Sequence, residues 1–305
     1  MFSIVRFAFI IGVMLFTASY AASSKGLDTS WDMRYIDLSK AHREGRYDEA
    51  IQIADELIAV LKANSLLSSE RMSSVMTKLG RIKSDQALYA EAHPHFIQAL
   101  ELSEKIFGVN SRDYEYSLMD VAGNHADQRQ FEKAEEIYLQ LLTLKEAKKD
   151  KQLSDIQVPL QALAHIYYEQ GRLDDAERHI LRALESSKAD VMGVKFDGSA
   201  HAWQSLGAID AARGKNKDAI AWHEKALKVL DKEFADSKKK WETAGNANYA
   251  RLIACHERLA KLHGAIHNTK EAKKHEKRAN QLKAEQPGEP MQLPEPWRQG
   301  VLPLR

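Results

Sequence analysis

Apolar residues recur along the chain at intervals of three and four, and the same pattern returns several times. A clear copy consists of Tyr89, Ala92, Phe96 and Ala99, in which an alanine follows a large residue and a second large residue follows the alanine. The alanines that align the copies are Ala50, Ala92, Ala134, Ala176, Ala219 and Ala272, the last two in looser matches. The first three intervals between them are 42 residues each, followed by 43 and 53. Such spacing places one apolar stripe along a helix, and the alanine marks a close approach of two helices.

A second helical pattern precedes each of these alanines. Pairs such as Leu79-Gly80 and Leu163-Ala164 lie 12 to 13 residues upstream, and several of the intervening polar breaks contain a glycine, as at Gly45 and Gly171. A glycine there ends a helix in a left-handed conformation. The alternation typical of strands is absent. The sequence therefore predicts an all-α solenoid of about six antiparallel helix pairs over residues 30–285, because one pair cannot bury its apolar stripe alone.

The order of these residues resembles the consensus of the tetratricopeptide repeat (TPR). Leu79-Gly80, Tyr89, Ala92, Phe96 and Ala99 match its positions, although the period is longer than the usual length of about 34 residues. The longer period is similar to that of the kinesin-light-chain type of TPR. The resemblance implies a right-handed superhelix that binds other proteins. It is specific for the fold and weak for function, because such repeats serve many unrelated partners.

The resemblance also implies a binding groove, because the first helix of each TPR pair lines the concave face. Tyrosines, amides and histidines suit an extended peptide, since they offer apolar contact together with hydrogen bonds to its backbone. The alternative for any one of these residues is ordinary solvated helix surface. The positions that fall on the groove by register are Tyr35, His42, Arg43, Thr77, Arg81, Tyr116, Met119, Gln161, His165, Tyr168, His201 and Gln204.

The two ends of the predicted solenoid differ from the repeats. The sixth repeat is expected to begin near Thr243, after a basic stretch, and its charged second helix, residues 271–284, would form a solvent-facing cap. Residues 286–305 contain five prolines, so we expect an extended, disordered tail. A docking motif at residues 293–297 is the alternative for this tail.

The N-terminus predicts export. An apolar run over residues 7–16 follows Arg6, and small residues precede a cleavage point after Ala21, so residues 1–21 are interpreted as a signal peptide and residues 22–29 as a linker. The run is shorter than the roughly 20 residues that span a bilayer. The alternative is a membrane anchor formed by residues 4–22. We expect a periplasmic or secreted protein without stable membrane insertion after cleavage.

Charge and motifs exclude several function classes. Lys and Arg total 44 against 43 Asp and Glu, and this balance argues against nucleic acid as a partner. No phosphate-binding loop, dinucleotide fingerprint or nucleophile elbow occurs in the sequence. We therefore predict that the protein is not an enzyme and carries no cofactor.

Histidines and the single cysteine are the remaining candidates for chemistry. His256, His263 and His267 are spaced to share one helix face, with His275 on the next helix, but the spacing of a zinc-binding motif is absent. Packed or surface histidines are favoured over metal ligands, so no metal site is predicted. Cys255 lies within an apolar helical pattern and is interpreted as a small buried residue.

The sequence thus predicts an exported scaffold or adaptor that holds a peptide or protein partner, of unknown identity, in its concave groove. Two alternatives stay open. One is a structural component of an envelope complex that assembles with itself. The other is an accessory subunit of an exported enzyme that binds metal through the C-terminal histidines.

Overall fold

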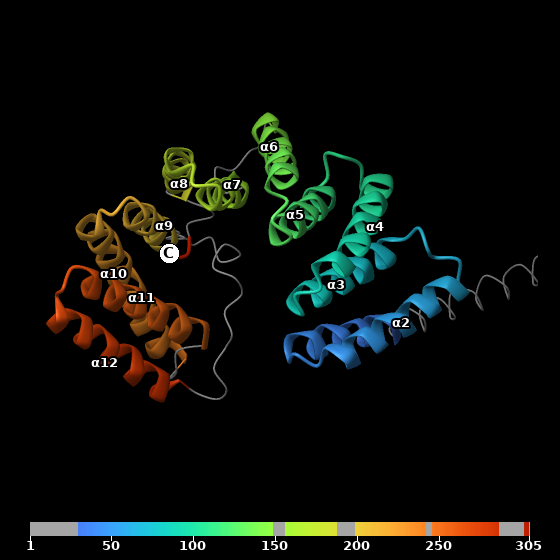
Figure 1. The fold of residues 1–305 in the computed structure, drawn as a ribbon. Helices are drawn as coiled ribbons and strands as arrows, with labels where there is room; N and C mark the ends of the chain where they lie inside the picture. The colour runs from blue at the N-terminus through green and yellow to red at the C-terminus, as the bar shows by residue number, and fades with distance from the viewer. Residues whose placement is uncertain (1–29, 149–155, 188–198, 242–245, 287–301, 305) are drawn as a thin grey trace, which may run out of the picture. The chain divides into compact units, whose positions relative to one another are not determined.

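The computed structural model describes residues 30–148, 156–187, 199–241, 246–286 and 302–304. In these ranges every regular element is a helix and no strand occurs (Figure 1), so the prediction of an all-α fold is confirmed. Residues 30–43 are helical, and the helices that follow are α2 (Tyr47–Ala63), α3 (Glu70–Asp85), α4 (Tyr89–Phe107), α5 (Arg112–Asp127), α6 (Phe131–Ala147), α7 (Gln157–Glu169), α8 (Leu173–Ser187), α9 (Ser199–Ala212), α10 (Asn216–Trp241), α11 (Asn246–Ala265) and α12 (Thr269–Glu285).

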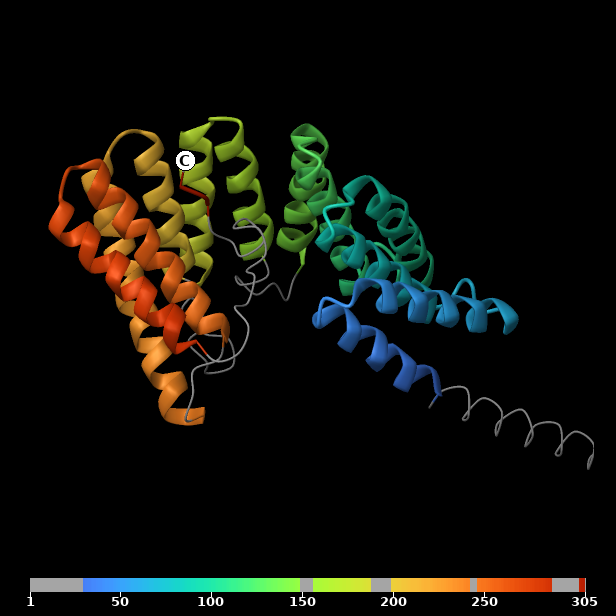
Figure 2. The same ribbon diagram turned by 60° about the horizontal axis from the view of Figure 1, so that its bottom comes forward.

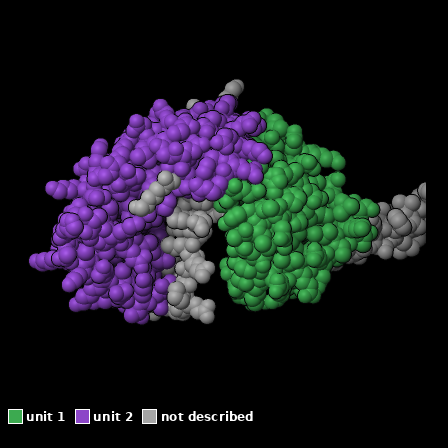
Figure 3. All heavy atoms as spheres, in the orientation of Figure 1, with its two compact units in different colours: residues 1–128 green, residues 129–305 purple. Residues whose placement is uncertain are grey.

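The chain divides into two compact units, residues 1–128 (unit 1) and residues 129–305 (unit 2), which are coloured separately in Figure 3. Within unit 1, α2 packs on α3, α3 on α4 and α4 on α5. Within unit 2, each helix from α6 to α12 packs on the next one along the chain, and Figure 2 shows α8 to α12 stacked as successive hairpins. Packing between neighbours in sequence is the arrangement of a helical solenoid.

The alanines that align the repeats lie at the centres of these contacts. Ala50, Ala92, Ala134, Ala176 and Ala219 are fully buried, and Ala272 is 7% exposed. Ala50 belongs to a core cluster formed by residues 30–43 and α2 to α4, and Ala219 belongs to another over α9 to α12. A methyl group at these sites lets two helix backbones approach closely, which a longer side chain would prevent.

The turn inside each helix pair has a common backbone conformation. A residue with positive φ lies five positions before each aligning alanine: Gly45, Ala87, Arg129, Gly171, Gly214 and His267, with φ between 58° and 76°. Three of these residues are not glycine, which explains why the glycine breaks marked only part of the repeats. The turn is therefore set by the packing of the two helices as well as by residue type.

Serine side chains fix where two of the first helices begin. Ser69 Oγ accepts a hydrogen bond from the Met72 N–H at 3.3 Å, and Ser111 Oγ accepts one from the Tyr114 N–H at 3.1 Å. Each serine caps the free N–H groups of the helix that follows it. Together these caps set the register of α3 and α5.

The interval of 53 residues between Ala219 and Ala272 is the longest in the chain's repeat, because it contains most of α10, a helix of 26 residues. The basic residues that precede the predicted start of the sixth repeat belong to α10, which continues to Trp241. Phe234 near its end packs edge-on against Tyr249 of α11, with ring centroids 4.8 Å apart. On α12 the buried residues are Ala272, His275, Ala279 and Leu282, and most of the others face solvent. α12 thus has the polar outer face of a capping helix.

Residues 1–21 and 22–29, interpreted as signal peptide and linker, lie outside the described residues, as does most of the tail. Residues 302–304 differ from the expected disordered tail, because Leu302 is only 2% exposed and Pro303 accepts a hydrogen bond from Tyr168. Among the described residues, no helix combines the length and hydropathy needed to cross a membrane.

Candidate protein-binding surface

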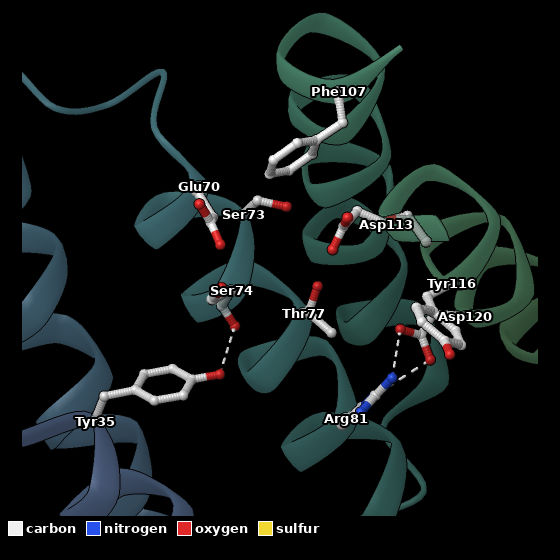
Figure 4. A pocket seen from close by; sticks show the side chains of 11 residues that line it. Tyr35, Glu70, Ser73, Ser74, Thr77, Arg81, Phe107, Asp113, Tyr116 and Asp120 are labelled. Atoms are coloured by element: carbon white, nitrogen blue, oxygen red, sulfur yellow. Dashed lines mark hydrogen bonds and ion pairs between the residues drawn. The ribbon is translucent and has the colours of Figure 1, made fainter. Parts of the chain in front are cut away.

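In unit 1 the first helices of the repeats, residues 30–43, α3 and α5, share one surface, which we call the first-helix face. A cavity of about 200 Å³ opens on it (Figure 4). All three of these helices contribute to its lining, together with the end of α4. The lining residues are Tyr35, Glu70, Ser73, Ser74, Thr77, Arg81, Phe107, Asp113, Tyr116, Ser117 and Asp120.

Helix α3 supplies one wall of the cavity as a polar stripe. Glu70, then Ser73 or Ser74, then Thr77 and Arg81 recur at intervals of three or four residues, so they follow one side of the helix. The opposite side of α3 buries apolar residues in the core. The capped start of α3 at Glu70 places a carboxylate at one end of the stripe, and Arg81 lies about three turns beyond it.

Two interactions hold the side chains around the cavity (Figure 4). Arg81 donates to both carboxylate oxygens of Asp120, from Nε at 3.2 Å and from Nη2 at 3.0 Å. Tyr35 Oη donates to the backbone oxygen of Ser74 at 3.4 Å, and the Tyr35 ring stacks on Trp31 with centroids 5.0 Å apart. A bidentate pair fixes both partners more firmly than a single contact. Burial raises the pKa of Tyr35, so its hydroxyl stays neutral at physiological pH.

The cavity has an excess of negative charge. Arg81 neutralises Asp120, whereas Glu70 and Asp113 form no ion pair within the part of the chain that the structure describes. Tyr116 is 56% exposed, an unusual exposure for a large aromatic ring, and it lines the same cavity, where Figure 4 shows it beside Asp120. Acidic groups next to an exposed aromatic face attract cations.

The predicted groove residues of unit 1 divide into two sets. Tyr35, Thr77, Arg81 and Tyr116 meet at the cavity, as their register on successive first helices suggested. The others do not line it: His42, Arg43 and Met119. His42 Nε2 lies 2.8 Å from Asp85 Oδ2, Arg43 is exposed, and Met119 is half-buried.

Sequence reasoning missed the acidic residues of the cavity. Glu70, Asp113 and Asp120 line it, and the first two lie in the first turns of α3 and α5. Acidic residues in a first turn are explained by the helix dipole, so the sequence offered no reason to assign them to a binding site. Glu70 follows the capping Ser69 by one residue and Asp113 follows the capping Ser111 by two, so no common spacing aligned them.

In unit 2 the first-helix face is formed by α7, α9 and α11, and several predicted groove residues there are not open to a partner. Gln161 and His201 are half-buried, but His165, Tyr168 and Gln204 are 7%, 0% and 4% exposed. In this structure these three side chains are enclosed, and their role in a binding groove stays a prediction. The reason for the enclosure at Tyr168 is tertiary, because its Oη donates to the backbone oxygen of Pro303 at 2.9 Å.

The C-terminal histidines form a packed cluster between α11 and α12. His256 Nδ1 lies 2.8 Å from His275 Nδ1, and the rings of His263 and His275 stack with centroids 5.6 Å apart. Burial and the neighbouring His275 lower the pKa of His256 to about 4. Within the described ranges, no three His, Cys, Asp or Glu residues come together in a geometry suited to a metal ion.

Cys255 is fully buried, and burial raises the pKa of its thiol to about 11. A neutral, inaccessible thiol is a poor nucleophile, which agrees with its interpretation as a small core residue.

These features define a helical-repeat protein whose first helices present polar and aromatic side chains on one face. A sequence model of the tetratricopeptide repeat matches residues 71–147 and 155–232, just over half of the chain. The chain therefore belongs to the tetratricopeptide repeat family. No curated protein sequence matches it.

Solved structures with the same fold share little sequence with this chain. BtubC (BKLC) from P. vanneervenii is 16% identical, with a TM-score of 0.56 over 87% of this chain and 95% of its own. A putative kinesin light chain from Podosopora anserina is 15% identical, with a TM-score of 0.53 over 71% and 98%. A Rap protein complexed with competence and sporulation factor is 14% identical, with a TM-score of 0.53 over 84% and 75%. These likenesses confirm the fold and the similarity to kinesin-light-chain repeats.

Proposed function

We propose that this protein is an exported, non-enzymatic scaffold that binds a protein or peptide partner on the first-helix face of unit 1. The observation that carries the proposal is the cavity between residues 30–43, α3 and α5, with its exposed Tyr116 and with Glu70 and Asp113, which form no ion pair among the residues that the structure describes. TPR proteins bind protein or peptide partners, and the lining of this cavity supports the proposal that one binds here.

The chemistry of the cavity favours a basic side chain of the partner. A lysine or arginine reaching into it would meet Glu70 and Asp113, and its alkyl part would contact the ring of Tyr116. Cation–π contact and charge-assisted hydrogen bonds would both contribute to binding. A cavity of about 200 Å³ is small for a drug-sized ligand but adequate for one long side chain of an extended segment.

A related fold supports this kind of use. The Rap protein noted above was solved in complex with competence and sporulation factor, so a protein of similar fold forms a complex with another molecule. The proposal for this chain rests on its own side chains, since the shared sequence is slight.

The test measures binding of peptides with and without a basic residue. A panel of extended peptides is screened by fluorescence anisotropy, and the tightest binder is compared with the version in which its Lys or Arg is replaced by Glu. We expect the Glu70→Gln/Asp113→Asn variant to lose about tenfold or more in affinity for the basic peptide, because two charge-assisted contacts are removed. Tyr116→Ala should weaken binding in the same direction.

A matched control distinguishes the loss of contacts in the cavity from the effect of a changed net charge on peptide binding. Asp55→Asn/Glu101→Gln removes the same charge from exposed positions on the second helices α2 and α4. Its affinity should equal that of the unmodified protein. Equal losses in both double variants, or no preference for basic peptides, would refute the proposed site.

Export is the second part of the proposal and has a direct test. If residues 1–21 are removed during export, mass spectrometry of the protein from its native envelope fraction will show an N-terminus at Ala22. Recovery of the intact N-terminus from a membrane fraction would favour the anchor formed by residues 4–22 instead.

A further inference from the structure

The segment Leu302 to Leu304 lies on the first-helix face of unit 2. It is drawn as the short red piece beside α9, next to the mark of the C-terminus, in Figures 1 and 2. Leu302 is 2% exposed, and the segment is separated by residues 287–301 from the described end of α12. A fully extended chain of that length reaches up to about 50 Å, so the segment can reach this face from its own α12.

Side chains from three successive first helices bind the backbone of this segment. Ser205 Oγ of α9 accepts a hydrogen bond from the Leu302 N–H at 3.1 Å. Tyr168 Oη of α7 donates to the Pro303 carbonyl at 2.9 Å, and Lys261 Nζ of α11 lies 3.5 Å from the Leu304 carbonyl. Recognition of consecutive backbone groups is how protein surfaces hold an extended peptide.

The residue types of the segment fit this mode of binding. Leu304 packs against the apolar cluster of α9 to α12, and Leu302 is almost fully enclosed. Pro303 between them has no N–H that would need an acceptor, and its ring restricts the backbone before binding. A segment that is already restricted loses less conformational entropy when it docks. Two apolar contacts and the backbone hydrogen bonds therefore form together.

We propose that the first-helix face of unit 2 is a binding site for extended Leu-Pro-Leu segments, and that residues 302–304 of this chain occupy it. A partner segment of the same chemistry then binds only by displacing them. This inference rests on the proposed scaffold function, to which it adds a second binding surface, with its own ligand class and a built-in competitor.

The experiment compares the purified protein with its Leu302→Asp variant, using as the probe a fluorescent peptide of residues 299–304, which contains no basic side chain that the unit 1 cavity would bind. A charge at the enclosed Leu302 position should release the chain's own segment and leave the site open. A tethered competitor acts at an effective concentration in the millimolar range, so for a site of about 100 µM affinity the variant should bind the peptide roughly tenfold more tightly.

Two tyrosines of α7 provide a matched pair for the site itself. Tyr168→Phe, made together with Leu302→Asp, removes the hydroxyl that bonds Pro303 and should weaken peptide binding several-fold. Tyr167→Phe removes a hydroxyl that bonds Glu135 of α6 instead, and should leave peptide binding unchanged. Circular dichroism of each variant verifies that the helices are retained.

Three results would overturn the inference. The first is equal peptide affinity with and without Leu302→Asp. The second is a peptide affinity that Tyr168→Phe does not change. The third is a dimer that Leu302→Asp converts to a monomer, which would show that a second copy supplies the segment. Tyr116→Ala in unit 1 should not affect this peptide, so failure of the basic-peptide site and failure of this site can be told apart.

Discussion

His223 occupies in its repeat the position that Phe96 occupies three repeats earlier. Each side chain covers a glycine of the preceding helix: a Cβ added to Gly80 would lie 2.6 Å from the Phe96 ring, and one added to Gly207 would lie 2.8 Å from the His223 ring. His223 is fully buried, and neither of its ring nitrogens has a hydrogen-bond partner in the described part of the chain. A buried polar group without a partner costs free energy of folding.

The substitution His223→Phe should therefore stabilise the protein. Phenylalanine suits the equivalent site in the second repeat and removes two polar atoms that have no partner. We expect the free energy of unfolding to rise by about 1–3 kcal/mol, the usual penalty for such a group. Urea unfolding followed by circular dichroism measures the change. A decrease in the unfolding midpoint would show that the imidazole makes a contact that phenylalanine cannot replace.

At the scale of the element, close approach between α3 and α4 depends on the missing side chain of Gly80. The Phe96 ring fills the space that a Cβ would need, and the ring itself is 3% exposed and surrounded by core. Overpacking a buried helix contact usually costs about 1–3 kcal/mol. The pairing of a small residue with a large one thus sets how closely these two helices pack.

The packing role of Gly80 is tested by comparing the free energies of unfolding of two glycine-to-alanine variants. Gly80→Ala should lower the free energy of unfolding by about 1–3 kcal/mol, because the Phe96 ring must move. Gly264→Ala, at an exposed position in α11 with no atom within 4 Å of the added Cβ, should raise it by up to about 1 kcal/mol through helix propensity. Thermal or urea unfolding of both variants gives the comparison. Similar effects in the two variants would contradict a packing role for Gly80.

At the scale of the whole molecule, unit 2 contains buried and half-buried histidines that make it sensitive to acid. Burial, with help from the nearby Arg251 and Arg258, lowers the pKa of His201 to about 4. Burial also lowers the pKa of His223 to about 3 and that of His256 to about 4. These side chains are neutral in the folded protein near pH 6, whereas unfolded histidines begin to bind protons there. The unfolded state therefore gains more protons as the pH falls.

We expect stability to be fully present above about pH 6.5 and to decrease steadily between about pH 6.5 and pH 4. Since each unit of pKa shift corresponds to about 1.4 kcal/mol, the three histidines together account for a loss on the order of several kcal/mol. Urea unfolding at a series of pH values measures the slope, and hydrogen exchange should show loss of protection in α9 to α12. His223→Phe should reduce the slope, and an unchanged slope would exclude His223 as a contributor.

The amino-acid sequence determined the repeat by itself. Helix pairs, their period and the buried alanines depend on packing between helices that are adjacent along the chain, and such packing repeats and leaves a periodic pattern. Even so, three of the turn residues with positive φ, Ala87, Arg129 and His267, are not glycine, so the sequence did not mark these turns. At these three turns the packing of the two helices holds the backbone in the left-handed conformation, and only the structure shows this.

The sequence also placed Tyr35, Thr77, Arg81 and Tyr116 on one face, because register on successive first helices is part of the same period. It did not indicate the acidic lining of the cavity or the contact between Tyr168 and Pro303. These residues are 135 positions apart, and a single contact of that range has no counterpart in other repeats. Only the tertiary structure decided which part of the predicted groove is open and which part the chain itself covers.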